Sequence, residues 1–176
     1  MKTMAIRALR CDEWQAFREF RLHALREARS VFGSSYEAEA TKTPQEWQDL
    51  VSSASHQAFG LFDGERLVGI TATFPWKQDP SGETAVLAMS YILREHRGRG
   101  HSRMLYEARL NWIRTRPQFK RVVVSHRESN ETSRRAIRRH GFVVTHRAPH
   151  LWHDGTTEDE IFYELLLAQR DHENNS

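Results

Sequence analysis

The chain lacks the features that mark several protein classes. It has one cysteine, Cys11, so it cannot form an internal disulfide, and it has no cysteine cluster of the zinc-binding type. No apolar run approaches the roughly 18 residues that a membrane helix needs, and no apolar stretch follows the basic N-terminus as in a secretion signal. With 9 glycines and 5 prolines among 176 residues, the chain is not of low complexity. We expect a globular, cytoplasmic protein with no membrane partner.

Lysine is scarce as well. Of the 26 basic residues, 22 are arginine and 4 are lysine, and the formal net charge is +3. The planar guanidinium group of arginine binds phosphate through two parallel hydrogen bonds. The composition therefore favours a partner that carries phosphate, which could be a small ligand or a nucleic acid, because overall charge does not distinguish the two.

The hydrophobic periodicity predicts one α/β domain over 1–170, followed by a polar tail, 171–176. The expected strands, bounded by turn residues, are 5–9, 57–62, 67–74, 84–93, 122–125, 142–145 and 161–167. The expected helices begin near residues 14, 43, 101 and 130, the second of them with Thr43 and Glu46 as a capping pair. The segment 30–42 is read as a loop or a broken helix. The strand 84–93 is almost continuously apolar, which is typical of a strand buried on both faces.

The most informative segment joins strand 84–93 to the next helix through Arg97-Gly98-Arg99-Gly100. Glycine lets backbone N–H groups approach a ligand without interference from a Cβ atom, and a helix start adds unpaired N–H donors. These features predict a site for a diphosphate. The segment is not a Walker loop, because no Gly-Lys-Ser or Gly-Lys-Thr follows, and Arg103 stands where a dinucleotide fingerprint has its third glycine. The alternative is a solvated turn rich in glycine and arginine.

Two segments together resemble the GCN5-related N-acetyltransferase (GNAT) superfamily. Its first motif, [Gln/Arg]-x-x-Gly-x-[Gly/Ala], is matched by Arg97, Gly100 and Ser102, and its second by Asn130, Ala136, Gly141 and Phe142. The resemblance implies a central mixed, mostly antiparallel sheet of about seven strands flanked by about four helices. It also implies acetyl transfer from acetyl-CoA to a primary amine of a small molecule or peptide, by direct attack in a ternary complex. A homodimer is compatible with it, because dimers are common in the superfamily.

The resemblance assigns cofactor-binding roles residue by residue. The backbone of Ser90, Tyr91 and Ile92 would pair with the pantetheine arm and polarise the acetyl carbonyl, and Asn130 would reach the same region. The pyrophosphate would lie on the turn and the start of its helix, formed by Arg97, Gly98, Arg99, Gly100, His101, Ser102 and Arg103.

Ile137 is the main departure from the superfamily pattern. Many members have a tyrosine there that protonates the departing thiolate, and a general acid contributes about 10²–10⁴-fold to a rate where one is needed. The thiol of CoA should have a pKa near the ~8.5 of cysteine, so its thiolate is a fair leaving group without an acid. The departure makes a non-catalytic acyl-CoA-binding module the alternative function. Ser102 and Ser133 also differ from the pattern, but each is small.

The attacking amine must lose a proton before it reacts. His126, at the end of strand 122–125, is the candidate base. The alternative for His126 is a structural histidine that caps the strand beside Glu128. Glu83 and Glu128 are further candidates for the base.

Two loops are expected to wall the acceptor site. The segment 32–36 and the turn 146–154 would bring aromatic rings near the carboxylates of Glu37 and Glu39, which suits a cationic amine. The histidines of that turn lack a second cluster that would complete a metal site, so no metal is predicted. The arginines of helix 130–140 could bind nucleic acid, but no recognised nucleic-acid module accompanies them, so we favour a solvated basic face.

Overall fold

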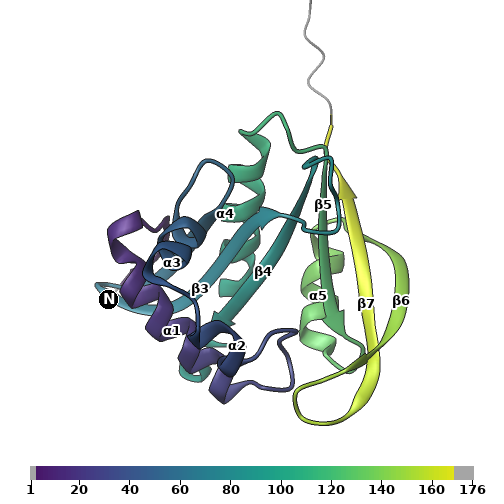
Figure 1. Cartoon of the computed structure of the whole chain (residues 1–176), viewed down its shortest axis with the longest axis horizontal. Helices are drawn as coiled ribbons and strands as arrows, with labels where there is room; N and C mark the ends of the chain where they lie inside the picture. Colours follow the sequence, from purple (N-terminus) through teal and green to yellow (C-terminus); the bar gives the residue numbers. More distant parts are fainter. Residues whose placement is uncertain (1–2, 169–176) are drawn as a thin grey trace, which may run out of the picture.

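The computed structural model describes residues 3–168, so the predicted tail 171–176 lies outside the described residues (Figure 1). The described residues form one seven-stranded sheet and five α-helices. The strands are β1 (Met4–Ala8), β2 (Gln57–Asp63), β3 (Arg66–Pro75), β4 (Thr84–Ile92), β5 (Arg121–Arg127), β6 (Val143–Leu151) and β7 (Thr157–Leu166). The helices are α1 (Trp14–Glu27), α2 (Tyr36–Ala40), α3 (Pro44–Val51), α4 (His101–Arg114) and α5 (Glu131–Arg139).

The sheet has the strand order β1-β2-β3-β4-β5-β7-β6. All neighbouring strands are antiparallel except β4 and β5, which are parallel and are joined through α4. The prediction of a mixed, mostly antiparallel sheet of about seven strands is therefore confirmed. Among the described residues, no helix is long and apolar enough to cross a membrane.

The helices cover both faces of the sheet. On one face, α1 and α3 pack on the first half of the sheet through a core that includes Phe17, Trp47 and Ile70. On the other face, α4 packs across β1 to β4, and α4 and α5 share a core with β5 and β7 that includes Leu110, Ile137 and Tyr163. The face of β5, β7 and β6 opposite α5 carries polar side chains, as the alternation of polar residues along β7 requires.

Local sequence explains the helix starts. At α3, Thr43 Oγ1 accepts from the N–H of Glu46 (3.2 Å), while the Glu46 carboxylate accepts from the N–H of Thr43 (2.7 Å), which confirms the predicted capping pair. The short helix α2 lies within the segment expected as a loop or broken helix, and Ser35 caps it by accepting from the N–H of Ala38. This helix makes the number five instead of about four.

Strands β4 and β5 pair over only three residues before they diverge. Thr84, Ala85 and Val86 lie opposite Arg121, Val122 and Val123, and no later residue of β4 pairs with β5. In Figure 1 the two strands meet near the top of the view and separate downward. The divergence leaves the backbone of Leu87–Ile92 without a strand partner on its β5 side.

The second half of β4 differs from the prediction of a strand buried on both faces. Leu87 is buried, but Ser90 is exposed and Tyr91 is half-buried. The reason is the divergence from β5, together with a bulge at Met89, whose φ is 60° and where the register with β3 shifts. The exposed half of the strand faces a groove.

Candidate functional site

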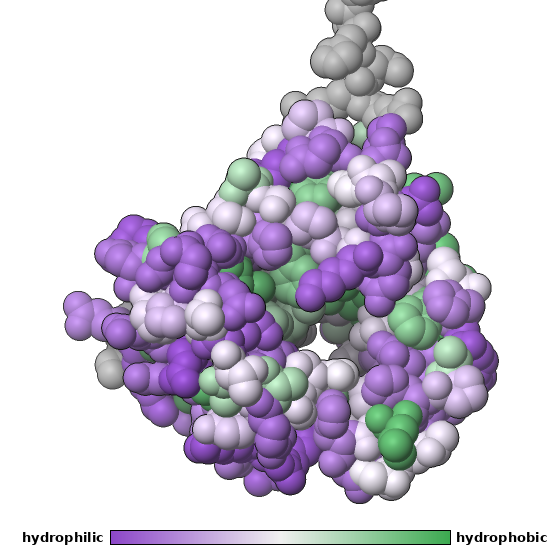
Figure 2. All heavy atoms as spheres, viewed as in Figure 1, coloured by the Kyte–Doolittle hydropathy of each residue, from purple (hydrophilic) through white to green (hydrophobic). Residues whose placement is uncertain are grey.

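A groove with a volume of about 390 Å³ lies between the diverging strands β4 and β5. Its floor is the second half of β4, and Val124 and Ser125 of β5 lie opposite. Figure 2 shows the molecule hollowed at this place, with an opening that passes through it. The side walls come from three further segments, with Ala28, Val31 and Phe32 after α1, Tyr106 and Arg109 on α4, and Asn130, Thr132, Ser133 and Ile137 at α5.

The groove has an entrance on each face of the sheet. Residues of α4 and α5 line it on one face, and Val31 and Phe32 from the segment after α1 line it on the other. A molecule bound along β4 from the α4 side can therefore meet a second molecule that enters from the α1 side. Such an arrangement suits a reaction between two substrates held together.

The turn between β4 and α4 is open and rich in N–H donors. Gly98 and Gly100 have φ values of 71° and 77°, which favour glycine, and a Cβ atom at either position would meet nothing within 4 Å. Gly100 is the N-cap of α4, and no side chain caps that helix. Among residues 3–168, the N–H groups of 98–102 donate no hydrogen bond. Unpaired donors at a helix start form a site for an anion.

Two arginines of this turn point in different directions. Arg97 folds back on the end of β4, where its Nε donates to the carbonyl oxygen of Ile92 (2.7 Å) and its guanidinium lies 4.9 Å from the ring centre of Tyr91. Arg103 is exposed on α4 and pairs with Glu107 (2.6 Å). Arg97 lines the groove, whereas the exposed side chains of Arg99, Ser102 and Arg103 lie outside its lining.

The other predicted cofactor-binding residues gather at the groove. Ser90 Oγ shares a hydrogen bond with Thr71 Oγ1 (2.7 Å), and Tyr91 packs edge-on against Phe20. Asn130 is the N-cap of α5, where its Oδ1 accepts from the N–H of Ser133 (3.1 Å). The structure therefore brings Ser90, Tyr91, Ile92, Arg97 and Asn130 into one lining, with the glycine turn at the end of β4.

His126 does not line the groove. Its side chain is buried among the β5–β7 core, where Nδ1 lies 2.6 Å from the carbonyl oxygen of Arg127 and Nε2 lies 2.9 Å from the hydroxyl of Tyr163. A carbonyl can only accept, so Nδ1 carries the proton and Nε2 accepts from Tyr163. Burial lowers the pKa of His126 below its ordinary value. Both nitrogens are thus engaged away from the groove, with Arg127 and Tyr163 as partners in place of the Glu128 side of the strand end.

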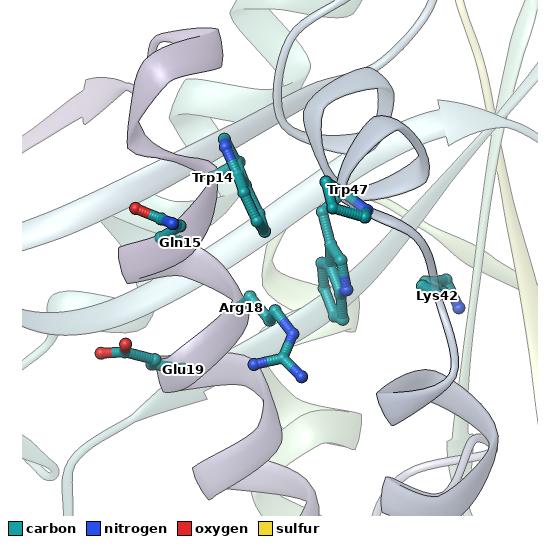
Figure 3. Close-up of a pocket in the computed structure, with 7 residues that line it drawn as sticks. Trp14, Gln15, Arg18, Glu19, Lys42 and Trp47 are labelled. Atoms are coloured by element: carbon teal, nitrogen blue, oxygen red, sulfur yellow. The ribbon is translucent and has the colours of Figure 1, made fainter.

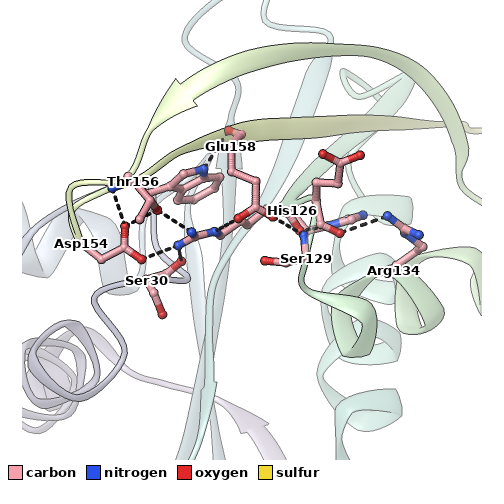
Figure 4. Close-up of polar contacts among 10 residues, drawn as sticks. Ser30, His126, Ser129, Arg134, Asp154, Thr156 and Glu158 are labelled. Carbon is pink, nitrogen blue, oxygen red and sulfur yellow. Dashed lines mark hydrogen bonds and ion pairs between the residues drawn. The ribbon is translucent and has the colours of Figure 1, made fainter.

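Arg127 joins the end of the sheet to the segment after α1 (Figure 4). Its guanidinium donates to Asp154 (2.6 Å) and Thr156 (2.5 Å) in the turn between β6 and β7, to Glu158 of β7 (2.5 Å), and to the carbonyl oxygen of Ser30 (3.1 Å) after α1. The hydrogen bonds of Asp154 and Glu158 raise the pKa of Arg127. These contacts hold the side chain between the two segments.

A second contact joins the same segments. His153 Nε2 lies 3.2 Å from the carbonyl oxygen of Gly33. The two loops expected to wall the acceptor site therefore meet, and Phe32 lines the groove.

Glu37 and Glu39 do not serve that wall as expected. Glu39 is buried and forms a bidentate pair with Arg21 (2.7 and 3.0 Å). Burial alone would raise the pKa of Glu39, but the hydrogen bonds and charge of Arg21 hold it below its ordinary value. Glu37 pairs with Arg29 at the surface (2.9 Å). Both carboxylates are therefore paired with arginines, Arg21 and Arg29, that lie close to them in the sequence.

One carboxylate in contact with the groove lining, Glu160 of β7, is absent from the residues predicted above. Ser125 Oγ, in the lining, donates to Glu160 Oε1 (2.5 Å), and Glu160 Oε2 lies 3.5 Å from His150 Nδ1. The signal in the sequence is the alternation of Glu158, Glu160 and Glu164 along β7, which places their side chains on one face. The contact of Glu160 with Ser125 depends on the pairing of β7 with β5.

The other candidate bases lie elsewhere. Glu83, before β4, pairs with Lys120. Glu128, after β5, pairs with Arg147 on β6. Neither carboxylate lines the groove.

The inner wall of the groove carries a buried cation. Arg109 of α4 is 1% exposed, and its guanidinium lies 4.8 Å from the ring centre of Tyr106. Its Nε donates to the carbonyl oxygen of Leu105 (3.0 Å), and the guanidinium also interacts with the hydroxyl of Tyr106. Burial lowers the pKa of Arg109 to about 10. Ile137 of α5, itself 1% exposed, lines the same groove.

A second hollow of about 280 Å³ lies between α1 and α3, away from the groove (Figure 3). It is lined by Trp14, Arg18, Lys42 and Trp47 among others, but the ring of Trp47 has no exposed surface, and its Nε1 has no hydrogen-bond partner among the described residues. Within residues 3–168, no group of three His, Cys, Asp or Glu side chains is placed to hold a metal ion.

The basic residues of α5 are partly neutralised. Arg134 pairs with Glu131 (2.8 Å) and donates to the carbonyl oxygen of Glu128 (3.0 Å). Arg135, Arg138 and Arg139 are exposed. These three side chains face solvent, as both the solvated face and the nucleic-acid alternative require.

Comparison with known proteins gives one family match. The model of the acetyltransferase (GNAT) family matches residues 13–142. No curated protein matches the sequence significantly. The family match covers the groove, the glycine turn and α5, and it ends at Phe142, before β6 and β7.

Several solved structures share the fold. A GNAT-family acetyltransferase from Streptococcus pneumoniae superposes with a TM-score of 0.80 at 15% identity, over 94% of this chain and 100% of that one. A ribosomal-protein-alanine N-acetyltransferase from Brucella melitensis gives 0.75 at 16%, over 93% and 99%. Arabidopsis thaliana NAA60 in complex with acetyl-CoA gives 0.71 at 13%, over 94% and 99%.

Proposed function

Because the chain belongs to the acetyltransferase (GNAT) family, we propose that it transfers the acetyl group of acetyl-CoA to a primary amine of a small molecule or peptide. The observation that carries this proposal is the groove between β4 and β5, with an open glycine turn at one end and an entrance on each face of the sheet. The groove admits both substrates at once, so direct attack needs no covalent intermediate on the protein.

The residues present fit acetyl-CoA. The unpaired N–H groups of 98–102 suit the pyrophosphate, with Arg97, Arg99 and Arg103 as nearby cations. The backbone of Ser90–Ile92, which has no strand partner on its β5 side, and the side chain of Asn130 suit the amide groups of the pantetheine arm. When bound, acetyl-CoA supplies the acetyl group as a thioester. The N–H groups of β4 along the groove can then polarise a carbonyl held against them.

The acceptor enters past Phe32 and Ser125. An ammonium group at this place faces Glu160, which Ser125 Oγ holds in position (2.5 Å). Glu160 takes the proton of the acceptor amine, and His150 beside it (3.5 Å) offers an outlet to solvent. His126 is not given this role, because both of its nitrogens are engaged in the core. The name of the Brucella relative, a ribosomal-protein-alanine N-acetyltransferase, supports an amine as the acceptor.

The test is release of CoA thiol from acetyl-CoA with a panel of primary amines and peptides, against a blank without acceptor. We expect release above the blank for one chemical class. If acetyl-CoA binds but no acceptor gives release, the alternative of a binding module gains support, since Ile137 occupies the wall where many members carry a tyrosine.

The role of Glu160 is tested with the acceptor found. Glu160→Gln should lower kcat by about 10²-fold at neutral pH and leave KM for acetyl-CoA unchanged, because a lost general base typically costs this much. Glu164→Gln on the same strand, where the carboxylate pairs with Arg121 (3.5 Å), is the matched control. A kcat in Glu160→Gln equal to that of the control would exclude Glu160 as the base.

A further inference from the structure

Arg109 is a buried arginine in the wall of the groove, where a charged side chain is unusual. It is buried on the inner wall of the groove, and no carboxylate among residues 3–168 pairs with it. The other buried arginine of the described chain, Arg21, is matched by Glu39 through two hydrogen bonds. Burying a charge without a partner is costly, because the charge loses its hydration and gains no ion pair in exchange. A negative charge that arrives in the groove would satisfy this cation.

The rest of the groove lining does not supply that charge. Its other titratable side chains are Tyr91 from β4, Arg97 from the turn and Tyr106 from α4. Burial raises the pKa of Tyr106, so its hydroxyl stays neutral. From α5 the lining side chains are Asn130, Thr132, Ser133 and Ile137, and from β5 they are Val124 and Ser125. The carboxylate in contact with the lining, Glu160, is held by Ser125 and His150 on the acceptor side.

The position of Arg109 along α4 indicates which part of an acyl-CoA it would meet. It lies nine residues beyond the N-cap Gly100, about 13 Å along a helix that rises 1.5 Å per residue. The phosphates bind at the cap, so this cation lies too deep in the groove to serve them. The arm between the phosphates and the sulfur is neutral, and the sulfur is the one atom of that arm that becomes negative during acetyl transfer.

The geometry points to Arg109 as a catalytic residue that stabilises the CoA thiolate as it leaves, with Tyr106 holding the guanidinium in place. This inference rests on the proposed function. The amine nitrogen forms a bond to the acetyl carbon, the carbon–sulfur bond breaks, and its electron pair goes to sulfur, while the amine proton passes to Glu160. A cation held in a buried wall, from which water is excluded, stabilises the negative charge on the sulfur more than water does. It supplies what an acid at Ile137 would otherwise provide.

The test measures the thiol of bound CoA, independently of turnover. The thiolate absorbs in the ultraviolet, and desulfo-CoA, which lacks the sulfur, provides the baseline at each pH. In the wild-type complex we expect the pKa of the bound thiol to lie at least one unit below the ~8.5 of a free thiol. In Arg109→Met it should return to the free value or above, and Arg109→Lys should lie between. Arg114→Met, an exposed arginine at the end of α4, is the matched control and should behave as wild type.

Kinetics supply a second readout once an acceptor is known. Arg109→Met should lower kcat by about 10²-fold with little change in KM for acetyl-CoA, because a donor that acts on developing charge stabilises the transition state more than the ground state. If wild type binds CoA but its thiol keeps the free pKa, the role of Arg109 is overturned and acetyl transfer still stands. If wild type binds neither CoA nor desulfo-CoA, the proposed function fails with it.

Discussion

Gly100 has a backbone φ of 77°, which favours glycine, and the space around its Cα atom is open to a ligand. We expect Gly100→Glu to abolish the thermal stabilisation by acetyl-CoA, because the carboxylate would repel the pyrophosphate. A thermal-shift assay with and without acetyl-CoA measures this. Gly100→Ala imposes the same backbone strain without the charge and should lose less. Gly82→Glu, at a glycine with φ of 72° in another turn, should keep the full shift.

His126 makes stability depend on pH. Its folded-state pKa lies below its ordinary value of about 6.5 because its ring is buried, so the folded protein resists protonation that the unfolded chain accepts. The free energy of unfolding is therefore at its full value above about pH 6.5 and falls as the pH drops from there toward the folded pKa. His56, whose pKa burial also lowers, acts in the same direction.

Denaturant unfolding between about pH 7.5 and 5 measures this dependence. His126→Gln should reduce the slope, and His56→Gln should remove a further part of it. An unchanged slope in both variants would mean that carboxylates account for the whole effect.

At the scale of elements, the turn between β6 and β7 and the segment after α1 are joined chiefly by Arg127. The substitution Arg127→Met removes the hydrogen bond to the carbonyl oxygen of Ser30 and the ion pairs with Asp154 and Glu158. We expect the segment 30–34 to open more often, so trypsin should cleave after Arg29 several times faster. Arg147→Met is the matched control, because Arg147 binds Glu128 and Asp159 on the same sheet without touching that segment. Equal cleavage rates in the two variants would contradict the proposed tie.

The elements themselves were largely predictable, because their signals are local. The capping pair of Thr43 and Glu46 and the glycines before α4 each act within a few residues. The bulge at Met89 was not predictable, because its positive φ comes from a register shift against β3.

The site was predictable only in part, because some of its residues are marked by local motifs and others are brought together by contacts between distant parts of the chain. The residues that line the groove from β4 and α5 follow from motifs in one stretch of chain. Glu39 is neutralised by Arg21, 18 residues earlier, and Glu160 reaches Ser125, 35 residues earlier, only because β7 pairs with β5. Contacts at such separations leave no local pattern to read.

At the scale of the whole molecule, the sheet consists of two halves joined by three residue pairs of β4 and β5. A ligand that lies in the groove touches both halves at once. We expect acetyl-CoA to slow amide hydrogen exchange in Leu87–Ile92 of β4 and in 124–133 across the groove. Adenosine 3′,5′-bisphosphate, which lacks the pantetheine arm, should protect the turn 97–103 and leave 124–133 as in the free protein. Protection of all three segments by both ligands would argue against binding of the arm along β4.

The opening through the molecule also bears on the order of events in a catalytic cycle (Figure 2). Under the proposed function, two entrances on opposite faces would let either substrate bind first, because neither would block the path of the other. The acetylated product would be able to leave past Phe32 while CoA is still bound on the side of α4. An inhibitor bound at one entrance would then leave the other entrance open.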